Sequence, residues 1–518
     1  MKTDTLIIGS GVAATAVATK LLDHNPEAEI LVLEAGPKVK MRDFALFQEY
    51  LVTNNLPYEF CEDLNYPSRD KPGENLNIGG TVVPLRGSRL MIYGGSTVHW
   101  GGWSFRLKPE DFRLQSETGK GIDWPIDYEE LEPFYGQAEH FIGVSGDSEN
   151  HNIPRTTPYP YPAFPYTLED SLMIEALEEL DLQYNAMPIA RHGITDTDSP
   201  HAPCQTTGTC KYCPFGARFV AGNFLDDMLR LEHHPNFDVR YNKVVQELIV
   251  SSKDRVDGVV YYDKDTGETK TVTTNRVILA AGAIESPKLL MRSTSEFWPN
   301  GVGNDEDLVG RNLITHPYFI FQATLPENPE KLQAEMNFPT LVSRYYDSKA
   351  EQKKGKFILV HPPSTPEFAA TNSGINISNL VEAMQNGVTR EEINEMMVGK
   401  TYVQIHGIIE IFSEYKNRVM NFDKVNHLGL KETIVDYTQD PEFNARMEEV
   451  KGIVNTIFEA MGATGTTRVM LSWRADHSAC TTRMSDTPDI GVVDKNLQVH
   501  GINNLFIPSN GSFSPEFS

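Results

Sequence analysis

The chain has 518 residues, of which 40% are hydrophobic and 23% charged, a balance typical of a soluble globular protein that can bury a large core. Its 71 acidic residues outnumber 46 basic ones and give a net charge of −25. This charge disfavours binding to nucleic acid and docking on an anionic membrane surface, and no apolar run reaches the roughly 18–20 residues of a membrane span.

The N-terminal stretch MKTDTLIIGSGVAATAVATKLL has one lysine followed by apolar residues, as a signal peptide does. However, it carries Asp4 early and two glycines in its middle, and a helical spacing follows them. We therefore interpret it as part of the folded protein. We expect a cytoplasmic location, unless the chain is exported to the periplasm together with a partner that carries a signal.

The first elements form a predicted strand–turn–helix–strand unit. Residues 4–9 are a short apolar run that ends in glycine, and residues 12–24 are alanine-rich with helical spacing. Residues 29–33 form a second buried strand. Such a unit is the building block of a parallel sheet covered by helices.

The turn of this unit, GSGVAA, has the G-x-G-x-x-A spacing of a dinucleotide-binding fingerprint, with Gly9, Gly11 and Ala14. The first glycine permits a tight turn, the second lets the backbone approach a pyrophosphate, and the small third residue lets the helix pack on the strand. Glu34 ends the next strand, 20 residues after Ala14, where its carboxylate can accept hydrogen bonds from a ribose. The alternative is an ordinary glycine-rich turn in another α/β domain.

Further along the chain, residues 86–103 form a glycine-rich loop with an embedded His-Trp pair, and residues 123–146 start at a proline and continue as an acidic helix. Residues 277–292 are predicted to form another strand, glycine turn and helix. Residues 318–460 mix alternating strand-like runs with charged helical stretches, which predicts a second domain on the substrate side. Residues 504–513 are again a strand followed by a turn.

Six motifs in this order make the chain resemble the glucose–methanol–choline (GMC) oxidoreductases, which are FAD-dependent enzymes that act on CH–OH groups. The motifs are GSGVAA with Glu34, YGGSTVHWGG, DWPIDYEELEPFY, AAGAIESPKLL, VGRNLITHP and HSACTTRM followed by GVVDKNLQVHGINNLF. Within the family, the chain is most similar to the catalytic subunits of bacterial sugar dehydrogenases, and after them to pyranose oxidases. Only residues 318–460 match loosely.

The resemblance implies an α/β fold of the α+β kind, with a Rossmann-type FAD-binding domain assembled from discontinuous segments and a substrate-binding domain built on an antiparallel sheet. The segments that we expect in the FAD-binding domain are 1–160, 200–317 and 465–518. Those that we expect in the substrate-binding domain are 161–199 and 318–464.

The resemblance also assigns cofactor contacts by position. The fingerprint residues and Glu34 are expected at the FAD pyrophosphate and the adenosine ribose, and the strand that contains Val245 is expected at the adenine. The residues expected along the flavin are Gly94, Gly95, Ser96, His99, Trp100, Ala281, Gly282, Ser509 and Asn510.

His477 stands where the family has its catalytic histidine, ahead of a small-residue run and five residues before Thr482. Oxidation of a CH–OH group needs a base at the hydroxyl while the carbon gives a hydride to the flavin, and a neutral imidazole can take that proton near neutral pH. The alternative is a buried structural histidine. The family's second catalytic residue, a His or Asn, would follow residue 518, so either the sequence is truncated, which we expect, or its site has lost a part. In the second case, weak FAD retention and low activity are expected.

His99 occupies the position at which pyranose oxidases attach FAD covalently. The sugar dehydrogenase subunits also have a His-Trp pair there, without an expected covalent bond. We therefore expect non-covalent FAD with His99 and Trp100 as neighbours of the flavin, and keep a covalent link to His99 as the alternative.

Cys204, Cys210 and Cys213 lie within ten residues and are followed by a proline. The sugar dehydrogenase subunits have a similar run that holds an iron–sulfur cluster, although the second gap is one residue shorter here. Cysteines that pack as small hydrophobic residues are an equal alternative, and a zinc site with His201 is a weaker one.

Together these features predict an FAD-dependent dehydrogenase that oxidises a sugar or polyol and passes electrons to a partner subunit or an external acceptor. A small export subunit is a second kind of partner. The alternatives are an O2-using pyranose-type oxidase and a flavoprotein-like fold without catalysis. The sequence does not name the sugar, because fold does not fix substrate.

Overall fold

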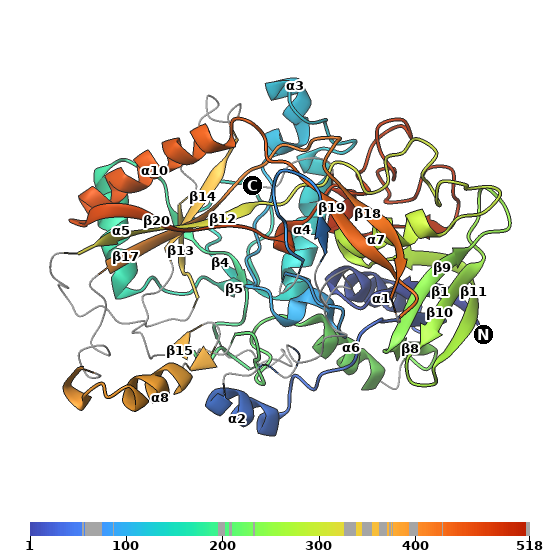
Figure 1. Ribbon diagram of the computed structural model, residues 1–518, viewed down its shortest axis with the longest axis horizontal. Helices are drawn as coiled ribbons and strands as arrows, with labels where there is room; N and C mark the ends of the chain where they lie inside the picture. Colours follow the sequence, from blue (N-terminus) through green and yellow to red (C-terminus); the bar gives the residue numbers. More distant parts are fainter. Residues whose placement is uncertain are drawn as a thin grey trace.

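The computed structural model shows two bodies side by side, each built around one large sheet (Figure 1). The sheet with the N-terminal strand β1 lies at the right of the figure, and the sheet with β12 and β20 lies at the left. The structure describes residues 1–53, 56, 58, 75–85, 88–194, 202–206, 210–230, 234–325, 338–343, 355–361, 370–371, 374–375, 377–392, 402–426 and 428–513.

The first sheet is parallel at its centre and ends in an antiparallel extension. In spatial order its strands are β8 (Phe237–Arg240), β2 (Ile30–Leu33), β1 (Lys2–Ile8), β11 (Glu268–Leu279), β10 (Gly258–Asp263) and β9 (Lys243–Ile249), with β21 (Leu505–Phe506) beside β11. All four residues of β2 are buried, as expected for a central strand covered on both faces.

The predicted strand–turn–helix–strand unit is confirmed. The helix α1 (Val12–His24) follows β1 and packs Ala14, Ala18 and Leu22 against Val32 of β2 in one buried cluster. The second predicted unit is also present, because β11 ends at residue 279 and α7 (Gly282–Arg292) follows. Both units place a helix N-terminus at the same edge of the sheet, since their strands run parallel.

The second sheet has six strands and is antiparallel throughout. Its order is β20 (Thr464–Trp473), β12 (Pro317–Thr324), β17 (Tyr402–Ile409), β14 (Phe357–His361), β13 (Leu341–Ser343) and β6 (Asn185–Ala186). The antiparallel sheet implied by the family resemblance is therefore present, and β20 leads directly toward His477. The boundaries of the two domains remain a prediction.

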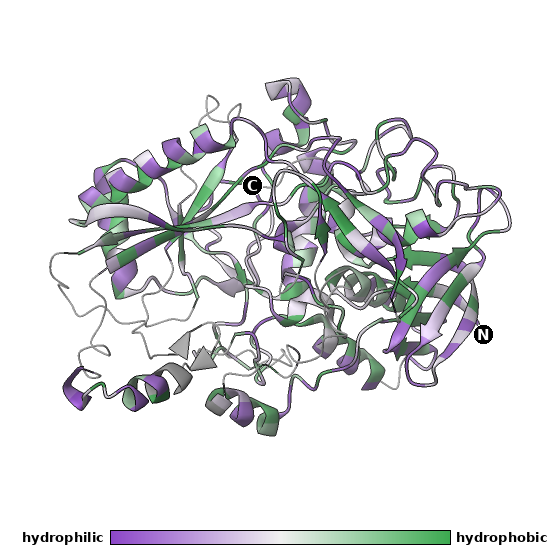
Figure 2. Ribbon diagram, viewed as in Figure 1, coloured by the Kyte–Doolittle hydropathy of each residue, from purple (hydrophilic) through white to green (hydrophobic). Residues whose placement is uncertain are grey.

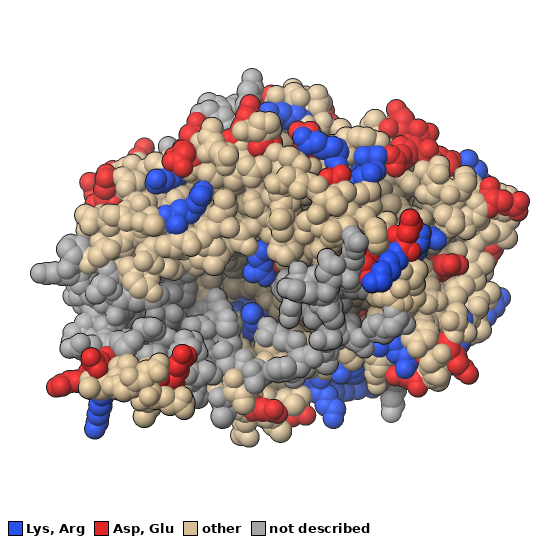
Figure 3. All heavy atoms as spheres, viewed as in Figure 1, with Lys and Arg blue, Asp and Glu red and all other residues tan. Residues whose placement is uncertain are grey.

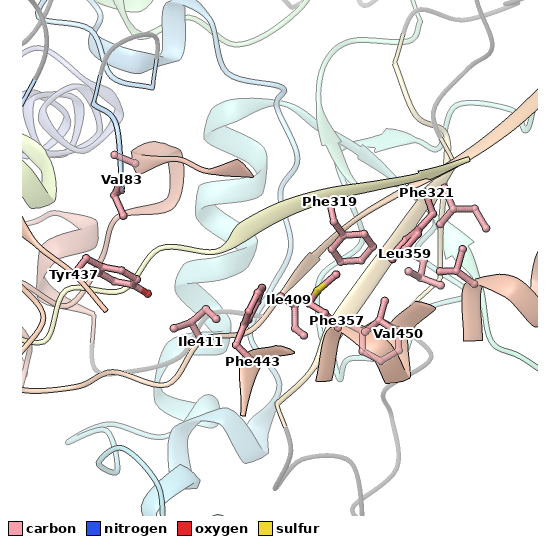
Figure 4. Close-up of a cluster of buried hydrophobic side chains, with 14 of the residues drawn as sticks. Val83, Phe319, Phe321, Phe357, Leu359, Ile409, Ile411, Tyr437, Phe443 and Val450 are labelled. Carbon is pink, nitrogen blue, oxygen red and sulfur yellow. The ribbon is translucent and has the colours of Figure 1, made fainter. Parts of the chain in front are cut away.

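One face of the second sheet carries the largest buried cluster (Figure 4). Phe319, Phe321 and Leu359 alternate with residues that point the other way, and they pack against Phe443 and Val450 of α10 (Phe443–Ala460). Figure 2 shows hydrophobic residues along β14 and hydrophilic residues recurring along α10, as expected for a helix that covers a sheet. At about 1.5–3 kcal/mol per fully buried large side chain, this cluster fixes the sheet in place.

Further helices and strands pack around the two large sheets (Figure 1). The helices among them are α2 (Phe44–Thr53), α3 (Leu114–Thr118), α4 (Tyr128–Ile142), α5 (Leu168–Glu179), α6 (Ala221–Arg230), α8 (Ile377–Gln385) and the 3-10 turns η2 (Gly95–Val98), η3 (Pro109–Arg113), η4 (Ala475–His477) and η5 (Asn510–Ser512). The strands are β3 (Leu76–Asn77), β4 (Val144–Gly146), β5 (Tyr161–Pro162), β7 (Ile189–Ala190), β15 (Ala370–Thr371), β16 (Gly374–Ile375), β18 (Arg418–Val425) and β19 (Lys431–Asp436). Within the described ranges, no helix has the length and apolar character that a membrane crossing requires.

Candidate active site

The predicted cofactor residues converge at the edge where the parallel strands end. Ile8 of β1 pairs with Leu279 of β11, and Ile278 pairs with Phe506 of β21, so three segments that are distant in the sequence leave the sheet together. The carboxyl edge of a parallel sheet is where α/β folds bind their ligands.

The fingerprint turn adopts the conformation that its glycines predict. Gly9 has a φ of +98°, and a Cβ there would lie 2.6 Å from the carbonyl oxygen of Ala280. A Cβ at Gly11 would meet nothing within 4 Å, so the N-terminus of α1 is open on that side. The loop with the second glycine pair crosses this turn, since Gly94 donates its N–H to Ser10 Oγ at 2.9 Å. A Cβ at Gly95 would lie 3.2 Å from Gly11 Cα.

Glu34 lies at the end of β2 and is buried, with 5% of its surface exposed. Its carboxylate accepts hydrogen bonds from the N–H and hydroxyl of Ser10 at 3.1 and 2.6 Å and from Gly36 N–H at 2.9 Å. Burial nevertheless outweighs these bonds and raises the pKa of Glu34 from 4.5 to about 7. Additional hydrogen-bond donors, such as the ribose hydroxyls of a dinucleotide, would therefore stabilise the ionised carboxylate of Glu34.

We expect Glu34 to make the cofactor-free protein less stable as the pH rises from about 4.5 to about 7. The folded state holds the proton more tightly than the unfolded state in this window, so the free energy of unfolding falls with pH, by at most about 3 kcal/mol. Urea unfolding of the wild type and of Glu34→Gln at pH 5 and pH 8 measures this. The wild type should lose more stability than the variant between the two pH values, and equal losses would contradict the assignment.

The second glycine turn connects the first sheet to the loop of His477. Gly282 has a φ of +74° and begins α7, after Ala281, and a Cβ there would lie 3.9 Å from Asn510 Oδ1. Asn510 donates its side-chain N–H to the carbonyl oxygen of Ser478, and its own carbonyl accepts from Cys480 N–H at 3.2 Å. The neighbouring Ser509 turns this segment, because its Oγ accepts from Gly511 N–H at 3.1 Å.

His477 meets a second histidine, His316, which belongs to the motif VGRNLITHP and is usually structural in the family that the chain resembles. Ile314 and Ala479 form an antiparallel bridge, and their N–H groups donate to each other's carbonyl oxygens at 3.3 and 3.1 Å. Residues two positions away from such a bridge face each other on one side, which brings His316 opposite His477. The two rings lie 5.6 Å apart between centroids at 78°, an edge-to-face contact.

The two histidines differ in their surroundings. His316 is buried, and burial together with the charge of His477 lowers its pKa to about 3, so its imidazole is neutral at neutral pH. His477 has an exposed surface, yet the protein packed around its ring desolvates it and lowers its pKa, against an opposing effect of Asp476. Arg474 forms an ion pair with Asp476, with Nε and Oδ2 2.9 Å apart, and adds to the lowering. His477 is thus neutral and able to accept a proton.

The other predicted cofactor residues are the flavin neighbours Ser96, His99 and Trp100, and Val245, which is expected at the adenine. Burial and the nearby cations, led by Arg218, lower the pKa of His99 to about 3. Trp100 packs edge-to-face on Phe219 and donates its indole N–H to the Phe219 carbonyl at 2.9 Å. Ser96 accepts a bond from Leu90 N–H at 3.4 Å, and the Val245 carbonyl accepts from Arg292 at 2.9 Å.

The cysteine run has a different arrangement from the one that an iron–sulfur cluster requires. The sulfurs of Cys204 and Cys210 accept hydrogen bonds from the buried guanidinium of Arg191 at 3.5 and 3.2 Å. Among the described residues, which include Cys213, no three His, Cys, Asp or Glu side chains are placed to hold a metal ion. The guanidinium of Arg191, placed between two sulfurs, does not fit an iron–sulfur cluster at this position. His201, the fourth ligand considered for zinc, lies outside the described residues.

Polar side chains line one face of the second sheet, starting near His316 and His477. Tyr318 of β12 hydrogen-bonds to His406 Nδ1 of β17. His406 Nε2 bonds to Gln404 Oε1 at 3.2 Å, and Gln404 donates to Gln322 Oε1 at 2.8 Å. All four side chains are half-buried, on the face opposite the cluster of Figure 4. We call Tyr318, His406, Gln404 and Gln322 the polar ladder.

Comparison with known proteins gives one consistent match. Family models described as GMC oxidoreductase match residues 3–318 and 419–516. The fructose dehydrogenase large subunit of Gluconobacter japonicus is 27% identical, over 99% of this chain and 94% of its own. The 6'''-hydroxyparomomycin C oxidase of Streptomyces lividus is 25% identical, over 99% and 87%. A solved structure of pyridoxine 4-oxidase from Mesorbium loti superposes with a TM-score of 0.62 at 18% identity, over 99% of this chain and 94% of that one, and shares the fold.

Proposed function

Because this chain belongs to the GMC oxidoreductase family, we propose that it oxidises a CH–OH group of a sugar or polyol with FAD and uses His477 as the base. Members of this family are oxidoreductases that bind FAD. The observation that carries the proposal is the position of His477, which Asn510 and Ser478 link to the glycine turn at Gly282.

The residues present fit FAD. The open side of Gly11 leaves the N-terminus of α1 free for a pyrophosphate, and Gly9 and Gly95 leave no side chain in the way. A buried guanidinium, Arg89, has no hydrogen-bond partner for its Nε atom among the described residues and marks a place for a negatively charged group. FAD bound here would supply the hydride acceptor.

The side chains of this protein would then control the proton. His477 would take the proton of the substrate hydroxyl, because its neutral imidazole can accept it at working pH. His316, packed edge-to-face against it, would hold the ring in one orientation. Asp476, paired with Arg474, would stabilise the imidazolium that forms.

The polar ladder supports a substrate with several hydroxyl groups. Arg474 acts electrostatically on both Tyr318 and His477, so the ladder starts beside the base. From Tyr318 to Gln322 the strand rises about 13 Å, at roughly 3.3 Å per residue, and offers phenol, imidazole and amide groups along the way. A face of this kind suits a sugar or polyol better than a simple alcohol.

We propose dehydrogenase activity in preference to oxidase activity, because the relative that is 27% identical over nearly the whole chain is a dehydrogenase large subunit. The same relative supports a partner subunit as electron acceptor. We propose non-covalent FAD beside His99 and derive no electron-transfer step through the cysteine run. The FAD-binding residues proposed are those that meet at the sheet edge, in segments 1–160, 200–317 and 465–518.

Anaerobic titration of the FAD-loaded protein with a substrate panel tests the proposal. Sugars and polyols should bleach the flavin absorbance, and an artificial acceptor should restore it faster than O2 does. Acid precipitation should release the yellow colour into the supernatant. A protein that binds FAD and is reduced by no member of the panel would contradict the proposed function, and colour in the pellet would indicate a covalent bond to His99.

The variant Gln404→Leu extends this test to the polar ladder. It removes one partner of a neutral hydrogen bond, so we expect KM for a sugar to rise about 3- to 10-fold with kcat unchanged. KM for a simple alcohol should not change. Gln115→Leu, an equal chemical change at an exposed position, is the control. Equal effects on both substrates would show that the ladder does not contact the sugar.

A further inference from the structure

Arg89 is a buried cation with an unsatisfied hydrogen-bond donor. Its side chain is 6% exposed, and its Nε atom has no hydrogen-bond partner. It forms no ion pair with any residue in the described part of the chain. A buried donor without a partner is costly, so the fold retains one only where something else pairs with it.

Two carboxylates of the segments beside Gly282 and His477 already have partners. Asp476 forms its ion pair with Arg474, with Nε and Oδ2 2.9 Å apart. Glu285, in the first turn of α7, forms an ion pair with Lys288 Nζ at 2.9 Å. The charge of Arg89 does act on Asp476, but the two side chains form no ion pair. The Nε–H of Arg89 therefore remains available to a bound ligand.

The position of Arg89 indicates which part of the cofactor it would contact. Its Nη2 atom lies 2.9 Å from where a Cβ of Gly282 would be, at the N-terminus of the eleven-residue helix α7. The positive end of the helix dipole and the guanidinium thus favour negative charge at the same point. The preceding residue, Ser88, lies within hydrogen-bonding reach of Asp476, the neighbour of His477. Arg89 therefore lies at the reacting end of the site.

The pyrophosphate of a dinucleotide belongs at the other turn, at Gly9 and Gly11 and the N-terminus of α1. We therefore infer that Arg89 would contact the flavin ring and not the pyrophosphate. Figure 3 shows a hollow near the middle of one face with basic side chains on its wall, consistent with a binding site that is rich in positive charge although the chain has a net charge of −25.

We propose that Arg89 stabilises the negative charge that the flavin ring gains on reduction, and thereby raises the reduction potential of the bound FAD. The inference rests on the proposed function. The C–H bond of the substrate would break and its hydrogen would leave with the electron pair as a hydride to FAD, while the hydroxyl proton would go to His477 and the substrate would become a carbonyl. The hydride would add one negative charge to the flavin, which Arg89 and the N-terminus of α7 would compensate.

The test compares the reduction potential and the FAD dissociation constant of the wild type, Arg89→Gln and Arg89→Lys. Loss of a hydrogen bond to a charged group should shift the equilibrium for FAD reduction about 10- to 100-fold toward the oxidised form, or about 30–60 mV for two electrons. Arg89→Lys should keep most of the potential because it keeps the charge. Arg276→Gln, at an exposed position, controls for the change in net charge and should have no effect.

A weaker FAD affinity at unchanged potential would overturn the proposal and place Arg89 at the pyrophosphate. Unchanged affinity and potential would show that Arg89 does not face FAD. A wild type that binds no FAD would instead refute the proposed function. If Arg89→Gln does not fold, the pH dependence of the wild-type reduction potential tests the proposal. This potential should fall by about 30 mV per pH unit, the slope for two electrons and one proton. Twice that slope would mean a neutral reduced flavin and no anion for Arg89.

Discussion

Replacement of His477 by alanine is expected to slow the reduction of bound FAD by substrate about 10²- to 10⁴-fold, the usual contribution of a general base. The reason is that the hydroxyl proton would have no acceptor, since His316 is buried behind the ring of His477 and the pKa of His316 is already about 3. Anaerobic stopped-flow measurement of flavin bleaching gives this rate directly.

The same experiment separates a missing base from a damaged site. FAD should remain bound to His477→Ala with an unchanged dissociation constant, and His500→Ala, a histidine outside the site, should react at the wild-type rate. Because burial lowers the pKa of His477, the wild-type rate should stay high as the pH falls to 6.5 and decline only in more acidic solution. Fast reduction in the alanine variant would refute the assignment of the base.

Replacement of Gly11 by alanine is expected to weaken FAD binding about 10- to 100-fold while the cofactor-free protein keeps its stability. The space beside Gly11 is open, so the new methyl group strains nothing in the protein alone. With FAD bound, the methyl group would crowd the pyrophosphate, and overpacking typically costs about 1–3 kcal/mol. Fluorescence titration of FAD and thermal unfolding of the cofactor-free protein measure the two quantities.

Gly9→Ala is the informative comparison. Here the methyl group would lie 2.6 Å from the Ala280 carbonyl at a φ of +98°, so the cofactor-free protein itself should unfold more easily. If Gly11→Ala lowers stability as Gly9→Ala does, or binds FAD normally, the space beside Gly11 is not the cofactor's place.

The local part of the site could be predicted from the sequence. The turn at Gly9 and Gly11, the helix 12–24 and Glu34 lie within one contiguous unit, and the structure has them as expected. Their chemistry depends on spacing and on backbone freedom, and a sequence displays both.

Other features depend on contacts between distant segments. His316 faces His477 only because a bridge joins Ile314 to Ala479, and no local pattern around His316 reveals that bridge. Arg89 lies within the predicted glycine-rich loop, but the missing partner of its Nε atom is a property of the whole fold. For the same reason the cysteine spacing suggested a metal cluster, since the sequence could not show that Arg191 lies between two of the sulfurs.

The pairing of β1 with β11 and of β11 with β21 also has a consequence for the order of events during synthesis. The sheet edge joins residue 8 to residue 279 and residue 278 to residue 506, so closing it requires nearly the full chain. Contacts of such long sequence separation form slowly and late, because the entropy of loop closure must be overcome first. During translation the first glycine turn therefore leaves the ribosome hundreds of residues before the loop of His477, and FAD capture would mark the last step of folding.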